Sequence, residues 1–468
     1  MSKPARSTPI LLVLALLMWC SADLARAGSR WIDDTLSTDL QEVLADPTRD
    51  RIYVSDPGSS DVVVLGSRTE RVLARIAVPR TLTDLAISKD GRYLAAGTSF
   101  AIVRIDLQSL EPETFALPAP FPSTVQSLTF DAGGRLIILG WRSHAYVIDL
   151  EAGEVVQSFG WGQHSWPFPI GHVETDATGE TLWIVSSYSN PSRVFEFDVS
   201  DPHHAVPVGD THTDHEIGSF ARDFAVGPDG RELYLAPGNP YGVQVLEATS
   251  LSLVGFLPGI LGPSAVTLSP SGRDVFFPVG SVYSSDRIFH YGTGTRELLF
   301  EYFLEDRVLN DLTRPRGLAV DHTGRRLYVA HGNSSQFNPS SVMLVIDLGR
   351  EVGIDIRPGS TSNRIHPGSR GLVPVAVLSA EEFDAALVDP QSLTFGPSEA
   401  TVSGRRWQFR DVDGDGRLDL FVAFRSDEAG IQCGDEVATV RGMGPDGHPF
   451  FGRDALVTVG CPRPVAAR

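Results

Sequence analysis

The sequence predicts an all-β protein, a seven-bladed β-propeller followed by a small β-sandwich-like domain. A unit of apolar strands joined by a tight polar turn recurs between residues 39 and 349, at intervals of about 42 to 52 residues. After residue 351 the repeat stops, and short apolar strands in a different pattern follow. We therefore expect one large repeat domain and one small β-domain.

The turns are the clearest part of the repeat, and six of the seven contain glycine. Tight hairpin turns need a positive φ, which glycine adopts at little cost. The seven turns lie at residues 47–50, 89–92, 132–135, 177–180, 228–231, 270–273 and 322–325. An apolar strand follows each turn, at residues 51–54, 93–96, 136–139, 182–185, 233–236, 275–278 and 327–330.

One such unit cannot bury both of its faces alone, so the units must stack, and seven of them predict a closed ring. The expected domains are a propeller over residues 28–350 and a β-domain over residues 351–462, with a tail at 463–468. The seventh unit lacks a fourth strand before the next domain begins. We expect Ser29 to Leu36 to supply that strand and close the ring.

The N-terminus is typical of a secretory signal peptide over residues 1–27. Lys3 and Arg6 precede an apolar stretch from Ile10 to Trp19, and Ala25 to Ala27 fit a cleavage site. The stretch is too short to be a stable membrane span, and we expect no transmembrane segment in the mature chain. Lipidation at Cys20 is an alternative, which the bulky Trp19 disfavours.

The chain is acidic, with 39 Lys and Arg against 58 Asp and Glu and a formal net charge of −19. Such a charge disfavours nucleic acid as a partner. We expect a secreted protein, periplasmic or at the cell surface, and a monomer. Cys433 and Cys461 remain after cleavage, and a pair in an exported chain favours a disulfide, with two buried thiols as the alternative.

Two segments resemble known families of exported proteins. The Tyr-Val and Val-Ile-Asp strands, as at 328–329 and 345–347, resemble the YVTN-type propeller repeats of surface-layer proteins. Residues 354–360, Ile-Asp-Ile-Arg-Pro-Gly-Ser, resemble a C-terminal domain of exported bacterial proteins that opens with Ile-Asp-Ile-Lys-Pro-Gly-Ser. These resemblances imply a propeller of unspecified role and a non-catalytic accessory module.

The C-terminal domain contains a predicted calcium loop. Its aspartates occupy positions 1, 3, 5 and 9 of an EF-hand-like pattern, with Gly416 at position 6 and a carbonyl ligand from Arg417 at position 7. The expected ligands are Asp411, Asp413, Asp415, Arg417 and Asp419. Val422 stands where a full EF-hand has glutamate, so a further ligand must come from elsewhere or from water. The alternative is an ion-free surface turn; we expect a structural Ca²⁺ and no organic cofactor.

No catalytic motif appears: there is no Gly-x-Ser-x-Gly elbow, phosphate-binding loop or His-Glu-x-x-His. Repeat alignment places polar residues where the innermost strands begin, at the mouth of the channel. These candidates for a small-ligand site are Glu42, Asp84, His172, Arg222, Asp223 and Arg316. The alternative is a ring of internal salt bridges.

Two further segments are candidates for contacts. An aromatic loop, with Trp161, His164, Trp166 and Phe168, could bind sugars or a protein partner, or could cover the propeller's own face. Histidines at 203, 204, 212 and 215 could bind a metal, but their spacing fits a polar surface loop better.

The leading hypothesis is an exported binding or scaffold protein whose propeller face recognises a protein, a glycan or a small polar ligand. The first alternative is a propeller enzyme, either a lactonase-like hydrolase or an oxidoreductase, with its site at the channel mouth. The second alternative is a structural component of the cell envelope.

Overall fold

The computed structural model contains two compact units, Gly28–Glu351 and Val352–Arg468, here called the propeller and the C-terminal domain. It describes residues 29–32, 39–79, 82–117, 125–140, 144–160, 171–187, 190–211, 217–259, 262–278, 287–304, 312–333, 340–404 and 407–461. Over these residues the secondary structure is strand, apart from two short 3-10 helices. None of them forms a helix long and apolar enough to cross a membrane.

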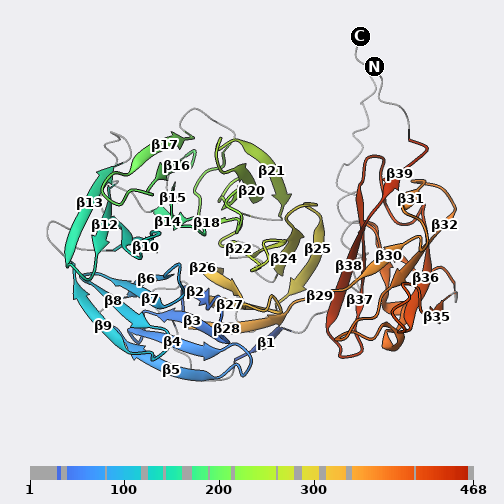
Figure 1. Ribbon diagram of the computed structural model, residues 1–468, viewed down its shortest axis with the longest axis horizontal. Coiled ribbons are helices and arrows are strands. Elements are labelled where there is room, and N and C mark those ends of the chain that lie inside the picture. Colours follow the sequence, from blue (N-terminus) through green and yellow to red (C-terminus); the bar gives the residue numbers. More distant parts are fainter. Residues whose placement is uncertain are drawn as a thin grey trace, which may run out of the picture. The chain divides into compact units, whose positions relative to one another are not determined.

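The described part of the propeller forms seven four-stranded antiparallel sheets arranged in a ring (Figure 1). We call them blades 1 to 7, in chain order of their innermost strands. Blades 1 to 3 are β2–β5 (Val43–Ala45, Arg51–Asp56, Asp61–Gly66, Val72–Ala77), β6–β9 (Leu82–Ile87, Tyr93–Thr98, Ala101–Asp106, Pro112–Ala116) and β10–β13 (Ser127–Phe130, Leu136–Gly140, His144–Asp149, Glu154–Gly160). Blades 4 and 5 are β14–β17 (Gly171–Thr175, Thr181–Ser186, Arg193–Asp198, Val206–Asp210) and β18–β21 (Asp223–Val226, Glu232–Ala236, Gly242–Glu247, Leu253–Pro258). Blade 6 is β22–β25 (Thr267–Leu268, Asp274–Pro278, Arg287–Gly292, Leu298–Phe303), and blade 7 is β26–β28 (Leu312–Val320, Arg326–Asn333, Ser340–Asp347) with β1 (Ser29–Trp31).

The predicted turns join the first two strands of each blade. Each of the six turns that contain glycine has one glycine with a positive φ, as the sequence indicates. At Gly179 a Cβ would also lie 2.4 Å from the backbone nitrogen of Ala132, so only glycine fits the contact with the neighbouring blade. Aspartates begin several of these turns and accept backbone N–H groups, as Asp131 does from Gly133 at 2.9 Å.

The hydrophobic core lies between adjacent blades. Tyr53 and Val64 of blade 1, for example, pack in one buried cluster with Leu85 and Val103 of blade 2. The second and third strands of a blade are buried on both faces, which explains their nearly continuous apolar sequences. Blades therefore stabilise one another by burying apolar surface that a single blade would leave in water.

The N-terminal segment supplies the fourth strand of blade 7, as predicted. β1 pairs antiparallel with β28, with Ser29 opposite Ile346 and Trp31 opposite Leu344. Arg30 forms ion pairs with Asp347 of the same blade and with Glu70 of blade 1. The observed strand ends at Trp31, before Ile32, and residues 33–36 of the predicted Ser29 to Leu36 segment lie outside the described residues.

The C-terminal domain is a small two-sheet sandwich. One sheet has the order β30-β32-β36-β35, the other contains β38-β37-β33-β34, and β31 pairs parallel with β39. Both sheets contribute to a single core, in which Val422 and Phe424 meet Phe395 and Val440. The elements are β30 (Ile354–Ile356), β31 (Arg364–Ile365), β32 (Leu372–Val377), η2 (Ala385–Leu387), η3 (Pro390–Ser392), β33 (Thr394–Phe395), β34 (Ala400–Thr401), β35 (Gln408–Arg410), β36 (Asp419–Arg425), β37 (Val437–Met443), β38 (Pro449–Ala455) and β39 (Val457–Thr458). β29 (Arg350–Glu351) ends the propeller unit.

Cys433 and Cys461 form the predicted disulfide, with Cα atoms 5.7 Å apart. The bond joins the segment before β37 to the end of the described chain, and it indicates an oxidising compartment.

Replacing Cys433 by serine is expected to destabilise the C-terminal domain by about 3 to 4 kcal/mol. The 28-residue separation sets this figure, because opening the loop restores chain entropy to the unfolded state. Urea unfolding of the mature protein, followed separately for each domain, measures the effect. Dithiothreitol should destabilise the wild type to the same extent and leave Cys433→Ser unchanged; a wild type insensitive to reduction would contradict the prediction.

Candidate functional site

The innermost strands β2, β6, β10, β14, β18, β22 and β26 surround the centre of the ring (Figure 1). The predicted channel-mouth residues lie in or beside five of these strands: Arg316 lies midway along β26, whereas the others lie at or near the strand beginnings. Four of them meet directly: Glu42, Asp84 and Asp223 all contact Arg316. Asp84 and Arg316, which are 232 positions apart in the sequence, therefore share one site.

Arg316 is the centre of this arrangement. Its Nε lies 2.9 Å from Glu42 Oε1, and its Nη1 lies 2.7 Å from Asp84 Oδ1. Its backbone N–H donates to Asp223 Oδ2 at 3.2 Å. Arg316 has a φ of +55°, which a non-glycine residue rarely adopts, and its side chain is only 21% exposed.

The carboxylates also join neighbouring blades. Glu42 Oε2 accepts the Leu85 N–H at 2.6 Å, and Asp84 Oδ2 accepts the Leu128 N–H at 2.6 Å. Asp223 Oδ2 accepts the Val266 N–H at 3.0 Å. Each of these acids therefore forms a hydrogen bond to the innermost part of the next blade, and its role in these contacts is structural.

Sequence reasoning missed a fourth member of this set, Ser127, whose hydroxyl accepts the Val173 N–H at 3.2 Å. Blades 4, 6 and 7 have His172, Ala265 and Gly317 at the equivalent position. Alanine and glycine have no side-chain acceptor there. The repeat alignment contains the signal that identifies Ser127, since it occupies the same position as Glu42 and Asp84.

Burial and the surrounding charges shift the titration of the channel groups. Burial raises the pKa of Glu42 well above its usual value, although the Arg316 charge opposes the shift. Burial likewise raises the pKa of Asp223 to about 7, again against Arg316. Burial, reinforced by Arg316, lowers the pKa of His172 to about 4, so the imidazole is neutral at physiological pH.

Two further charged residues belong to the channel, and the sequence analysis missed both. Glu174 follows His172 by two residues on β14, so it points to the same side of the strand. Burial raises the pKa of Glu174 to about 7, while the charges of Arg316 and Lys89 lower it. Lys89 Nζ donates to the Thr175 carbonyl at 3.3 Å.

The predicted channel residue Arg222 lies exposed just before β18, and its backbone N–H donates to the Ala236 carbonyl.

Replacing Glu174 by glutamine is expected to stabilise the protein at high pH only. The folded-state pKa of about 7 exceeds the unfolded value, so the folded carboxyl holds its proton more tightly. Ionisation therefore removes stability as pH rises from about 4.5 to about 7, by at most about 3 kcal/mol. Urea midpoints should rise for Glu174→Gln at pH 8 and match the wild type at pH 4, with the exposed Glu111→Gln as the control. An equal gain at both pH values would contradict the assignment.

The predicted calcium loop brings three carboxylates together. One oxygen each from Asp411, Asp413 and Asp419 lies within 4.8 Å of the others, and this is the one such metal-ligating group among the described residues. Gly414 and Gly416 both have positive φ, which folds the loop tightly. Asp415 lies outside this group, and its Oδ1 accepts the Arg417 N–H at 2.8 Å.

The donor set fits a hard divalent cation. Asp411 and Asp413 are exposed, whereas Asp419 is fully buried and its two oxygens accept the Ser379 and Val412 N–H groups at 2.8 and 2.7 Å. Three converging carboxylates repel one another unless a cation neutralises them. Oxygen-only ligands of this kind suit Ca²⁺.

The predicted aromatic loop lies outside the described residues, together with His212 and His215. His203 and His204 are described, and both are exposed in the turn before β17. His203 donates its backbone N–H to Asp201 at 2.9 Å. His203 and His204 therefore lie in an ordinary surface turn.

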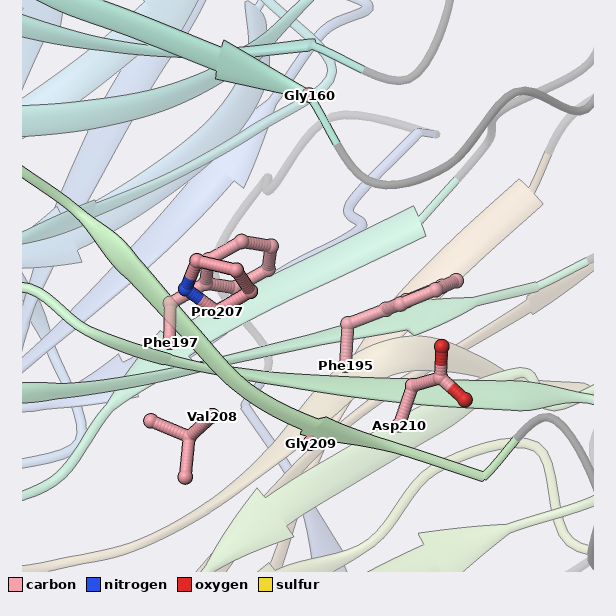
Figure 2. Close-up of a pocket in the computed structure, with 7 residues that line it drawn as sticks. All are labelled: Gly160, Phe195, Phe197, Pro207, Val208, Gly209 and Asp210. Carbon is pink, nitrogen blue, oxygen red and sulfur yellow. The ribbon is translucent and has the colours of Figure 1, made fainter.

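A groove of about 300 Å³ lies on the outer strands of blade 4, beside Gly160 of blade 3 (Figure 2), and the sequence did not predict it. Phe195, Phe197, Pro207 and Val208 give it an apolar lining, and Asp210 lies at its edge. Arg193 stacks on the Phe195 ring, and its Nη2 lies 3.3 Å from Asp210.

No family model matches the chain. Among solved structures, the chain is similar to hydrazine synthase from Kuenenia stuttgartiensis, with 16% identity and a TM-score of 0.50. The match covers 68% of this chain and 98% of that one. In all, 1337 solved chains match, so the architecture is widespread and identifies the fold alone.

Proposed function

We propose that this β-propeller protein is an exported binding or scaffold protein with a calcium-stabilised C-terminal accessory module. The observation that carries the proposal is the pairing of the channel groups. Glu42, Asp84 and Asp223 hold neighbouring blades through backbone N–H groups, and Glu42 and Asp84 form ion pairs with the guanidinium of Arg316. Carboxylates used in this way support ring closure rather than substrate chemistry.

The resemblances to YVTN-type repeats and to the exported accessory domain belong to this proposal, as does removal of residues 1–27. The disulfide supports an oxidising destination. The enzyme alternative would need a reactive metal or a free catalytic acid at the channel mouth. The envelope-component alternative would need self-association of the purified protein.

The mature protein, purified without chelators and passed through gel filtration, is expected to carry about one calcium per chain. Elemental analysis measures the metal, and light scattering measures the mass, which should be that of a monomer. Stoichiometric zinc, copper or iron would overturn the non-enzymatic proposal. Large assemblies that form as concentration rises would favour the structural role instead.

Asp413→Asn is expected to remove the calcium and to lower the thermal midpoint of the C-terminal domain. A ligand present at a hundred times its Kd stabilises by about 2.7 kcal/mol, so EGTA should destabilise the wild type by a comparable amount. Calorimetry with and without EGTA measures both effects. The matched control is Asp446→Asn, in another Asp-Gly turn of the same domain, which should keep the calcium. If both variants retain the ion, it binds elsewhere.

A further inference from the structure

Three loops of blades 4 and 5 form a continuous surface beside the channel mouth. They comprise residues 190–192, 217–222 and 237–241, and we call them the three-loop surface. The second loop leads directly into β18, so the surface lies at the end of the propeller where the innermost strands begin. Phe220 and Tyr241 are exposed here, together with the amides of Asn190 and Asn239.

Hydrogen bonds join the three loops into one unit. The Ser219 hydroxyl donates to Asn190 Oδ1 at 2.6 Å, and the Ser219 N–H donates to the Asn239 carbonyl at 2.7 Å. The first and second loops are also joined by two hydrogen bonds of 2.8 Å. The Ser192 N–H donates to the Gly218 carbonyl, and the Ala221 N–H donates to the Ser192 hydroxyl. A surface connected in this way has lost most of its loop entropy before any ligand arrives, which favours binding.

The backbone of the second loop directs Phe220 outward. Phe220 has a φ of +57°, a conformation that bulky side chains rarely adopt. The Gly238 N–H donates to the Phe220 carbonyl at 3.1 Å, and a Cβ on Gly238 would lie 3.3 Å from Phe220 Cβ. The rings of Phe220 and Tyr241 remain 48% and 52% exposed, although large aromatics are usually buried. An unusual backbone that presents an apolar ring to water is typical of a binding site.

The chemistry of the surface identifies its ligand class. Flat aromatic rings provide an apolar face, and the neighbouring amides provide uncharged donors and acceptors. Sugar rings match both, since they have an apolar C–H face and a rim of hydroxyl groups. The net charge of −19 disfavours polyanions, so an uncharged polymer is the complementary partner.

We propose that the three-loop surface binds a neutral polysaccharide, with Phe220 and Tyr241 stacking on sugar rings and Asn190 and Asn239 bonding their hydroxyl groups. The inference rests on the proposed binding function and specifies its site and ligand class.

Affinity electrophoresis of the mature protein tests this, with hydroxyethylcellulose, barley β-glucan, glucomannan and anionic alginate in separate gels. At least one neutral polymer should retard the protein, and alginate should not. Phe220→Ala and Tyr241→Ala should each weaken the retardation at least tenfold, while Phe220→Trp should retain it. The matched control is Phe100→Ala, which removes an aromatic ring with 52% exposure from blade 2.

Retardation by no neutral polymer, or by alginate alone, overturns the inference. An equal loss of retardation in Phe100→Ala also overturns the inference. Unchanged binding in Tyr241→Ala overturns it too, because this variant leaves the positive φ of Phe220 in place. Calorimetry on each variant shows that it is folded. Metal content and mass, measured on the same preparation, test the proposed function separately, so that function can stand when the inference fails.

Discussion

A chain that begins at Ser37 is expected to lose the stable propeller, because its ring can no longer close. β1 covers the outer edge of β28, and without it that edge exposes a row of unpaired backbone groups. Ile32 is also removed from the buried cluster that it forms with Val43 and Met343. Together these losses should exceed about 5 kcal/mol, comparable with the whole stability of many domains.

Circular dichroism melting and gel filtration of the truncated chain measure this effect. The truncated protein should melt far below the wild type or aggregate, and a synthetic peptide of residues 28–36 should partly restore the fold. A truncated chain that melts at the wild-type temperature would show that blade 7 is stable with three strands.

The ion pairs of Arg30 account for part of the stability that β1 contributes. Arg30 Nε lies 2.8 Å from Glu70 Oε2, and Nη2 lies 3.0 Å from Asp347 Oδ1, so one side chain links blade 1 to blade 7. Since its side chain is 36% exposed, Arg30→Ala should cost only about 1 to 2 kcal/mol. Arg68→Ala serves as the control. Its side chain is 69% exposed and pairs with Asp50, so this variant should cost less stability than Arg30→Ala.

Replacing Arg316 by methionine is the second change with a large expected effect. It should destabilise the propeller by about 3 to 5 kcal/mol at pH 8, because it leaves Glu42 and Asp84 buried without their counter-ion. Methionine is preferable to glycine here, since glycine would relax the positive φ of Arg316 and confuse the comparison.

The loss should depend on pH in a defined direction. Removal of the guanidinium raises the folded-state pKa of Glu42 and Asp223 further above their unfolded values. The folded protein then gains protons relative to the unfolded chain, so stability falls as pH rises and the deficit shrinks toward pH 5. Urea unfolding at pH 5 and pH 8 measures this difference.

Two further variants distinguish pairing from simple packing. The triple variant Arg316→Met, Glu42→Gln, Asp84→Asn should recover much of the stability at pH 8, because the buried charges are gone. Arg231→Met removes an 85% exposed arginine and should have little effect. A deficit that is the same at both pH values, and that the triple variant does not relieve, would mean that Arg316 acts through its volume alone.

The repeated architecture of this protein follows from patterns in its amino-acid sequence. The turn glycines, the apolar strands after them and the strand missing from the last unit are local patterns, and each corresponds to an observed element. The pairing of Cys433 with Cys461 was predictable for a different reason, since only two cysteines follow residue 27 in the sequence. Local spacing also located the Asp411–Asp419 loop, because its candidate ligands lie within nine residues.

Which side chains these elements bring together became clear from the three-dimensional arrangement of the blades. The alignment placed Glu42, Asp84 and Arg316 near one channel but could not show which groups pair, and it missed Ser127 and Glu174. The sequence did not predict the three-loop surface, because Asn190, Phe220 and Tyr241 come from separate loops. The physical cause is the ring itself. Repeat spacing determines the strands of each blade, whereas contacts across the channel and between loops depend on how seven blades stack and close.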